Sequence, residues 1–234
     1  MPNYLELNYS KEEYDVNMFP QKLCDYIIDN YFIYTNKSPK TLLDIGSGKG
    51  SALVGFKRRG LEVNGIDKRE ECLEILSDFD IRDCNLENEK FPFEDNTFDY
   101  VYSKSVLEHV YNTQNIVEET YRVLKPGGIT VQLTPDWLSD YKIFWDDPTH
   151  VKPFTRKGLQ NAFELNHFSN VKSERFYMLP FIWKYPWLIF LVKLLALMPT
   201  KYKWKDKQEL KQRVLIRHSK ERMLLVSAMK PKDE

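Results

Sequence analysis

Cysteine is scarce in this chain of 234 residues, which contains Cys24, Cys72 and Cys84 and no others. An odd number of cysteines, none at metal-ligand spacing, argues against a disulfide framework and indicates a reducing compartment. We interpret all three as ordinary small apolar residues.

An excess of charge is also missing, because 34 Lys and Arg residues balance 34 Asp and Glu residues. The chain as a whole therefore offers no argument for a nucleic-acid partner. Residues 1–15, MPNYLELNYSKEEYD, are polar and acidic and lack the basic start and apolar run of a signal peptide. With the cysteine usage, these features lead us to expect a cytoplasmic protein without a nucleic-acid partner.

Short apolar runs alternate with helical patterns along the chain, which is typical of an open, mostly parallel α/β sheet. The length suits one domain over residues 1–234, with residues 1–40 as an N-terminal helical cap. We expect strands over residues 41–45, 62–67, 81–86, 98–103, 129–135, 170–179 and 221–230. We expect helices near Ser10, over 21–34, 51–60 and 69–78, from about Thr113 to the Pro-Gly stop at 126–128, and from Thr155.

A glycine-rich turn follows the first expected strand, where TLLDI leads into Gly46, Gly48 and Gly50. Glycines allow a tight turn and a close backbone approach to a ligand. In open α/β sheets, ligands lie beyond the carboxyl ends of the strands. Asp67 ends the second strand, where a carboxylate can hydrogen-bond a ribose diol. The turn alone would also suit a plain strand-to-helix connection, but together with Asp67 it predicts an adenosine-containing cofactor.

The glycine-rich turn lacks the sequence patterns of two common nucleotide-binding sites, which limits the type of cofactor. No Gly-Lys-Ser/Thr follows at the spacing of a phosphate-binding P-loop. The dinucleotide pattern G-x-G-x-x-G fits poorly, because Ser51 occupies its third glycine position. Asp44, directly before the turn, suits a ligand with a cationic end, such as an amino group or a sulfonium.

Four segments, taken in series, resemble the successive motifs of class I S-adenosylmethionine-dependent methyltransferases. They are LLDIGSGKG, GID, FPFEDNTFDYVYSKSVLEHV and YRVLKPGG, within about residues 40–135. The resemblance implies a Rossmann-like, seven-stranded, mostly parallel sheet with an antiparallel last strand and helices on both faces. It implies S-adenosyl-L-methionine as cofactor.

The resemblance also implies roles for individual residues. The methionine part would be held by Asp44, Gly46, Ser47 and Gly48, with Ser103 beside it. Asp67, followed by Lys68, would hold the ribose. The family often has an aspartate that contacts the adenine amino group, but Asn85 stands at that place, with Asp83 two residues earlier as the alternative. The Asn85 carbonyl oxygen can still accept that hydrogen bond.

Two stretches are candidates for the acceptor side of the site. Glu108 and His109 follow the fourth strand, and residues 145–155, WDDPTHVKPFT, follow the fifth. A base is needed only if the acceptor must lose a proton. We predict His150 as that base, oriented by Asp147 or Asp146, with His109 as its competitor. A packing role for His109 and a rigid helix-capping turn for residues 145–155 are the alternatives.

No metal site is predicted, because no second histidine falls at ligand spacing from His150.

The segment 179–199, LPFIWKYPWLIFLVKLLALMP, is the most apolar part of the chain. Its expected helix, 187–198, is shorter than the about 20 apolar residues that span a bilayer. A lysine-rich segment, 201–213, follows, and this combination is typical of a helix that lies in a membrane interface. We therefore expect an insertion over 177–213, with membrane contact through 179–207 at the inner face of the membrane. A pocket lid and a homodimer interface are the alternatives.

These observations predict a methyltransferase that acts on a small-molecule, glycan or lipid-linked acceptor at oxygen. The alternative from another class is a non-catalytic scaffold or regulatory protein with the same fold. Asp44, Asp67 and the glycines argue against it, because a scaffold does not need them. A nicotinamide-dependent oxidoreductase is the third alternative, and it is weakened because Ser51 replaces the third glycine of the dinucleotide-binding pattern.

Overall fold

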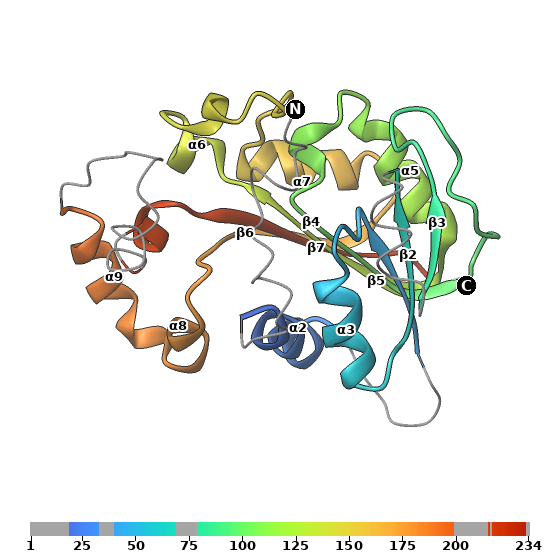
Figure 1. The fold of residues 1–234 in the computed structure, drawn as a ribbon, viewed down its shortest axis with the longest axis horizontal. Helices are drawn as coiled ribbons and strands as arrows, with labels where there is room; N and C mark the ends of the chain where they lie inside the picture. The colour runs from blue at the N-terminus through green and yellow to red at the C-terminus, as the bar shows by residue number, and fades with distance from the viewer. Residues whose placement is uncertain (1–18, 33–39, 69–78, 199–214, 216, 233–234) are drawn as a thin grey trace.

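Seven strands form one mixed sheet with helices on both faces (Figure 1). The structure is a computed structural model, and it describes residues 19–32, 40–68, 79–198, 215 and 217–232. The strands are β1 (Thr41–Ile45), β2 (Glu62–Asp67), β3 (Asp80–Asp83), β4 (Phe98–Lys104), β5 (Leu124–Pro135), β6 (Ser169–Phe176) and β7 (Met223–Met229). Their order is β3-β2-β1-β4-β5-β7-β6, and β7 runs antiparallel to both of its neighbours. The expected sheet, including its antiparallel last strand, is confirmed.

The order of the strands reverses at β1, which pairs in parallel with β2 on one side and β4 on the other. The chain winds outward to β3 in one direction and to β5 in the other. The connections after β1 and β4 therefore leave toward opposite faces, and the crevice between them is where open α/β sheets bind ligands.

Besides the helical residues 217–220, the described part of the chain holds seven α-helices with assigned bounds and three short 3₁₀ helices. They are α2 (Phe19–Asn30), α3 (Ser51–Arg58), α5 (Thr113–Val123), α6 (Trp137–Asp140), α7 (Arg156–Glu164), α8 (Pro180–Lys184), α9 (Ile189–Leu195), η2 (Leu107–His109), η3 (Phe144–Asp146) and η4 (Pro186–Leu188). In Figure 1, α2 and α3 cover one face of the sheet, and α5 and α7 cover the other.

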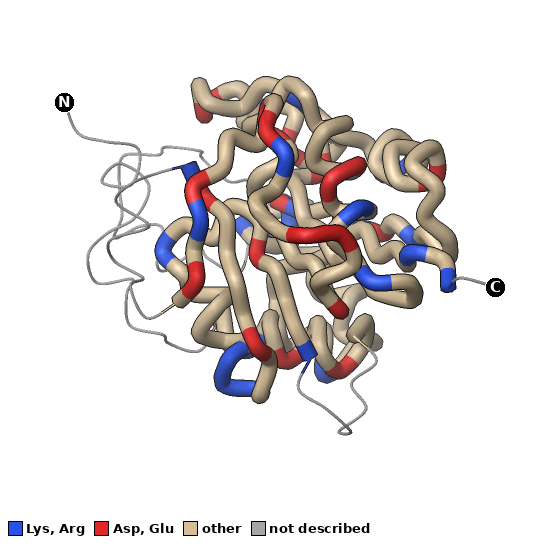
Figure 2. Tube along the Cα trace, turned by 90° about the vertical axis from the view of Figure 1, so that its right-hand side faces the viewer, with Lys and Arg blue, Asp and Glu red and all other residues tan. Residues whose placement is uncertain are grey.

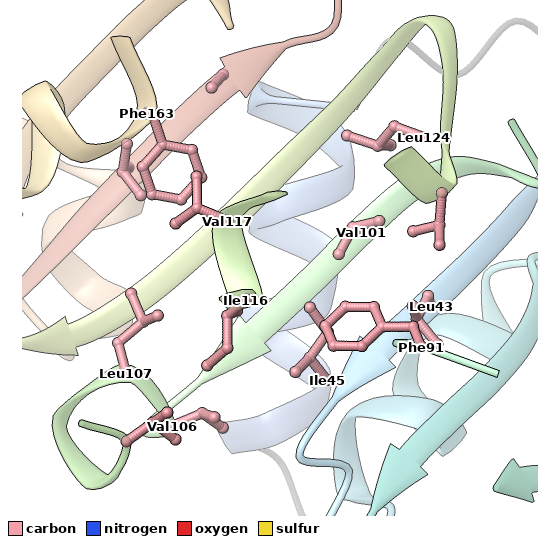
Figure 3. Close-up of a cluster of buried hydrophobic side chains, with 14 of the residues drawn as sticks. Leu43, Ile45, Phe91, Val101, Val106, Leu107, Ile116, Val117, Leu124 and Phe163 are labelled. Carbon is pink, nitrogen blue, oxygen red and sulfur yellow. The ribbon is translucent and has the colours of Figure 1, made fainter. Parts of the chain in front are cut away.

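The alternation of side chains along each strand divides the core into two layers. Leu43 and Val101 pack with α5 and α7 (Figure 3), whereas Leu42 and Tyr100 pack with α2 and α3. On α2, Leu23, Cys24, Ile27 and Ile28 are buried, as the helical spacing of its apolar residues predicts. Lys and Arg residues are interspersed with Asp and Glu residues along the chain (Figure 2).

Five strands differ from their expected bounds. β4, β6 and β7 do so by one to three residues at an end, whereas the differences at β3 and β5 follow from strand pairing. β3 ends at Asp83 rather than at residue 86, because its pairing partner β2 ends at Asp67, which lies opposite Asp83. β5 begins at Leu124 rather than at residue 129, since the Pro-Gly stop is absorbed into the strand through a register shift opposite β4 and a positive φ at Gly127. The helices expected near Ser10 and over 69–78 lie outside the described residues.

The apolar segment forms α8, η4 and α9 rather than one continuous helix over 187–198. Pro186 begins the 3₁₀ turn η4, which takes the first residues of the expected helix. Leu179, Ile182 and Val192 form a small buried cluster that joins α8 to α9. In the described part of the chain, no helix combines the length and the apolarity that crossing a membrane requires.

Candidate active site at the carboxyl edge of the sheet

The predicted cofactor residues gather where β1, β2 and β4 end. In the sheet register, Ile45 lies beside Ile66 on one side and beside Ser103 on the other. Asp44 and Asp67 are therefore close to the same edge as Ser103. Sequence positions 44, 67 and 103 come together because the carboxyl ends of parallel strands share one edge.

The glycine turn has the backbone geometry that the sequence predicts. Gly46 and Gly48 have φ angles of 68° and 51°, which lie in the left-handed region. A Cβ on Gly46 would lie 2.4 Å from a methyl group of Val106, whereas a Cβ on Gly48 would meet nothing closer than 3.9 Å. Gly46 thus allows the segment after β4 to approach, and Gly48 leaves open space above the turn.

The two carboxylates differ in their surroundings. Asp44 is 3% exposed and Asp67 is 4% exposed, and the amide of Gly48 donates to Asp67 Oδ2 at 2.9 Å. Burial raises the pKa of Asp44 well above its ordinary value, and the charge of Asp67 raises it further, while Lys104 acts in the opposite direction. A buried carboxyl of this kind favours a ligand that carries positive charge, because such a ligand stabilises the ionised form.

Two serine hydroxyl groups at this edge are buried without a hydrogen-bond partner among the described residues. They are Ser47 Oγ and Ser103 Oγ. A buried hydroxyl without a partner is costly, so these two sites fit a polar ligand. Together with Asp44, they fit the amino-acid end of S-adenosylmethionine.

The residues expected near the adenine lie at the edge of the sheet beyond β2. Asp83, the last residue of β3, is exposed and lies opposite Asp67. The side-chain oxygen of Asn85, Oδ1, accepts a hydrogen bond from the backbone amide of Glu87 at 3.2 Å and so stabilises a local turn. One lone pair of this oxygen is thereby occupied, and the second is what an adenine amino group would use. Lys68 is exposed.

The acceptor-side histidines are brought together from two distant segments. The rings of His109 and His150 lie 4.8 Å apart between centroids. The amides of Val151 and Lys152 both donate to the carbonyl oxygen of Glu108, at 2.8 and 3.1 Å. These two hydrogen bonds hold residues 145–155 against η2. The expected helix cap at Thr155 is also present, because Thr155 Oγ1 accepts from the amide of Gly158 at 3.2 Å.

The orientation of His150 differs from the expected one. Its Nδ1 lies 2.7 Å from the carbonyl oxygen of Phe144, so Nδ1 carries the proton and donates. Asp147 Oδ2 is 3.9 Å from Nε2, too far for a hydrogen bond, and Asp146 is exposed. The prediction that Asp147 or Asp146 orients the ring is therefore wrong: the backbone of η3 does so.

Asp147 is instead fixed by its own turn. Burial opposes its ionisation, but hydrogen bonds from the hydroxyl and amide of Thr149, at 2.6 and 2.9 Å, hold the pKa of Asp147 below its ordinary value. Asp147 therefore contributes a negative charge beside His150.

Lys104 and Thr134 also belong to this site, although the motifs did not single them out. Glu108 is 1% exposed, and burial raises its pKa to about 7, against the opposing effects of a hydrogen bond from Thr134 Oγ1 and the charge of Lys104. Burial lowers the pKa of Lys104, while the charges of Glu108 and Asp44 raise it. The position of Lys104 directly after the fourth strand, between Ser103 and the EHV segment, was the signal available in the sequence.

Fold and site together define a Rossmann-like, cofactor-binding α/β protein with paired carboxylates at the ends of β1 and β2. Residues 43–131 match the family model described as a methyltransferase domain. This match supports a class I S-adenosylmethionine-dependent methyltransferase domain over residues 43–131.

Relatives of this chain are similar over part of their length. It is 32% identical over 109 residues to an uncharacterized methyltransferase of Mycobacterium sp. (strain KMS), covering 46% of this chain and 43% of that protein. It is 34% identical over 100 residues to phosphoethanolamine N-methyltransferase 2 of Caenorhabditis elegans, covering 39% and 23%. It is 30% identical over 155 residues to malonyl-[acyl-carrier protein] O-methyltransferase 1 of Coxiella burnetii, covering 63% and 53%. The chain thus spans about half or less of the length of these curated relatives.

Solved structures share the fold. A SAM-dependent methyltransferase from Archaeoglobus fulgidus superposes with a TM-score of 0.65 at 20% identity, covering 97% of this chain and all 100% of that one. Phosphoethanolamine N-methyltransferase 2 of Haemonchus contortus, in complex with S-adenosyl-L-methionine, superposes with a TM-score of 0.67 at 17% identity, covering 99% and 60%.

Proposed function

We propose that this protein transfers a methyl group from S-adenosylmethionine to an oxygen atom of a small-molecule, glycan or lipid-linked acceptor. The observation that carries the proposal is the group formed by buried Asp44 and the two unpartnered hydroxyls of Ser47 and Ser103 beside Asp67. The family supports the cofactor. Two of the relatives named above are, by their names, an N-methyltransferase of phosphoethanolamine and an O-methyltransferase of malonyl-[acyl-carrier protein].

The cofactor, when bound, supplies a methyl group already activated on a sulfonium. Asp44 would pair with its positive charge, and the hydroxyls of Ser47 and Ser103 would hydrogen-bond its amino-acid end. Asp67 would accept from the ribose hydroxyls, with Lys68 beside it. Asp83 and Asn85 would compete for the adenine amino group.

On the acceptor side, the residues of the chain would position the hydroxyl group of the acceptor and receive its proton. Because His150 Nδ1 donates to Phe144, the neutral ring carries its lone pair on Nε2, where a base needs it. Asp147, 3.9 Å from that nitrogen, would stabilise the imidazolium that results. His109 is the competing base.

We further propose membrane contact through residues 179–207, in a cytoplasmic protein at the inner face of the membrane. What supports this proposal is a group of exposed apolar side chains on η4, on α9 and directly after α9, together with the exposed Lys184 at the end of α8 and Lys193 on α9. The exposed apolar residues are Trp187, Phe190, Leu191, Leu194, Leu197 and Met198. A homodimer that buries the same group is the second candidate.

Calorimetric titration of the protein with S-adenosylhomocysteine, S-adenosylmethionine and NAD tests the proposed cofactor. We expect one equivalent of S-adenosylhomocysteine to bind and NAD not to bind. Binding of NAD alone would support an oxidoreductase, and binding of none of the three would support the non-catalytic scaffold.

A further inference from the structure

We propose that Glu108, His109 and His150 form a binding site for a divalent transition-metal ion. One carboxylate oxygen of Glu108 and one ring nitrogen of each histidine all lie within 4.8 Å of one another. The sequence alone predicts no such site, because position 150 lies far from positions 108 and 109. The tertiary structure supplies the second histidine.

Both rings are oriented as metal ligands usually are. Metal-binding histidines commonly donate their other ring N–H to a carbonyl or carboxylate, which fixes the tautomer. Here Nδ1 of His150 lies 2.7 Å from the carbonyl oxygen of Phe144, and Nδ1 of His109 lies 3.1 Å from that of Thr149. A carbonyl oxygen only accepts, so Nδ1 of His150 carries the proton. Nδ1 of His109 also lies 2.9 Å from Thr149 Oγ1, but that hydroxyl donates to Asp147, so this Nδ1 carries the proton as well. Nε2 is therefore the atom with which each ring would bind an ion.

Glu108 completes the group with a carboxylate that is already held in place. Its Oε2 accepts from Thr134 Oγ1 at 2.9 Å, and its Oε1 lies 4.0 Å from Nε2 of His109. The side chain is 1% exposed, so its charge is costly without a cation nearby. Lys104 supplies one such charge without a direct contact. A metal ion between Glu108 and the histidines would supply a second, at bonding distance.

Asp147 adds negative charge at the rim of the same group. Its Oδ1 is anchored by Thr149, and its Oδ2 faces His150 Nε2 at 3.9 Å. Glu108 and Asp147 together balance the two positive charges of a divalent ion. Asp147 thus serves as a fourth ligand or as a partner of a metal-bound water.

The donor set selects the kind of ion. Two imidazoles and a carboxylate with open positions are typical of catalytic zinc and of non-haem iron sites, whereas Mg²⁺ and Ca²⁺ prefer oxygen ligands. Ligands at about 2.0–2.2 Å from the ion lie about 3–3.6 Å from each other, so the group must contract by roughly 1 Å.

The site has a consequence that rests on the proposed function. A metal ion there would bind the acceptor hydroxyl and lower its pKa. His150 would then serve as a ligand, which replaces its proposed role as base because both roles use the same Nε2 lone pair, and the proton of the metal-bound hydroxyl would pass to solvent water. Acceptors with a second oxygen next to the methylated one, able to chelate the ion, would be favoured.

Metal binding is tested on the full chain after removal of metal with a chelator, by titration with Zn²⁺, Mn²⁺ and Co²⁺. We expect one equivalent to bind, with Co²⁺ giving the visible absorption bands of a site with nitrogen ligands. His109→Ala and His150→Ala should each lower the affinity for the metal ion by more than about 100-fold. Mutation of residues that merely hydrogen-bond to a metal ligand already lowers metal affinity by about 10–100-fold. Wild-type protein that binds none of the three ions at one equivalent, or variants that bind as the wild type does, would overturn the proposal.

Two controls separate this result from misfolding. His167→Asn replaces an exposed histidine outside the group, at a positive φ that asparagine tolerates, and should leave metal binding unchanged. Affinity for S-adenosylhomocysteine, measured on every variant, reports whether the fold is intact. Cofactor binding without metal binding refutes the metal site alone, and metal binding without cofactor binding refutes the proposed function alone.

Discussion

At the scale of single residues, two buried carboxylates support the proposed cofactor site. Asp67 is fixed by the glycine turn, through the amide of Gly48. Asp44 lies behind that turn with its pKa raised by burial. The first carboxylate suits neutral hydroxyl groups and the second suits a cation, which is the combination that S-adenosylmethionine presents.

Asp67→Ala should weaken the binding of S-adenosylhomocysteine by at least about tenfold, because hydrogen bonds to a charged acceptor contribute about 1.5–3 kcal/mol each. Calorimetric titration measures the change. Asp146→Ala removes an exposed carboxylate on the acceptor side and should leave the affinity as it is. Equal affinities for wild type and Asp67→Ala would contradict the assignment of Asp67 to the ribose.

Asp44→Asn should stabilise the free protein at pH 8 and weaken cofactor binding. The pKa of Asp44 is raised in the folded state, so above the ordinary value of 3.8 the folded state binds more protons than the unfolded state. Stability contributed by this group is therefore present at low pH and is lost as pH rises. Denaturant unfolding at pH 5 and pH 8 measures the effect, and the gain from Asp44→Asn should be larger at pH 8. A gain that is equal at both pH values would argue against a buried, ionising Asp44.

At the scale of elements, short segments between strands and helices position the acceptor side. η2 presents Glu108 and His109, and η3 orients His150 through the carbonyl oxygen of Phe144. α7 begins directly after this segment, with Thr155 as its N-cap. The N-cap at Thr155 fixes the point where residues 145–155 join α7, and so it helps to position that segment.

Thr155→Ala should lower the free energy of unfolding by about 1 kcal/mol, within the range of about 0.5–2 kcal/mol typical of lost N-caps. The hydroxyl that accepts from the amide of Gly158 disappears, while the exposed position of residue 155 leaves little packing to lose. Denaturant unfolding measures the change. Thr155→Ser keeps the cap and should stay close to wild type, and a loss as large in Thr155→Ser as in Thr155→Ala would locate the effect elsewhere.

At the scale of the whole molecule, the two faces of the sheet are closed by helices, while η4 and α9 present apolar side chains to solvent. Trp187 is 66% exposed and Leu197 is 80% exposed. Exposed apolar side chains gathered on one element commonly mark a contact surface. A membrane and a second copy of the chain are the two occupants that the proposals above name.

The protein should sediment with anionic liposomes at low salt and be released at high salt, because screening weakens the attraction of lysines to the lipid headgroups. Phe190→Glu combined with Leu194→Glu should reduce the bound fraction severalfold, since the apolar face contributes its buried area. Leu165→Glu, at a separate residue that is 80% exposed, is the matched control. Absence of liposome binding, with a stable dimer in solution, would favour the homodimer instead.

The proposed cofactor residues could be named from the sequence. Asp44 and the glycines are adjacent in the chain, and Asp67 and Ser103 each lie at the carboxyl end of a recognisable strand. Local patterns determine where strands end, and parallel strands bring those ends to one edge. The strand positions, the antiparallel last strand and the helices α2, α3, α5 and α7 follow from the same local patterns and from the family resemblance.

The acceptor half was decided by the tertiary structure. His109 and His150 meet because the amides of Val151 and Lys152 bond to the carbonyl of Glu108, a contact between segments some forty positions apart that no periodicity encodes. The partner of His150 is a backbone carbonyl, which side-chain chemistry in the sequence does not reveal. Local periodicity determines elements and the ends of strands, whereas the meeting of two loops depends on the packing of everything between them. The proposed cofactor residues therefore follow from the sequence alone, whereas the meeting of Glu108, His109 and His150 depends on the tertiary structure.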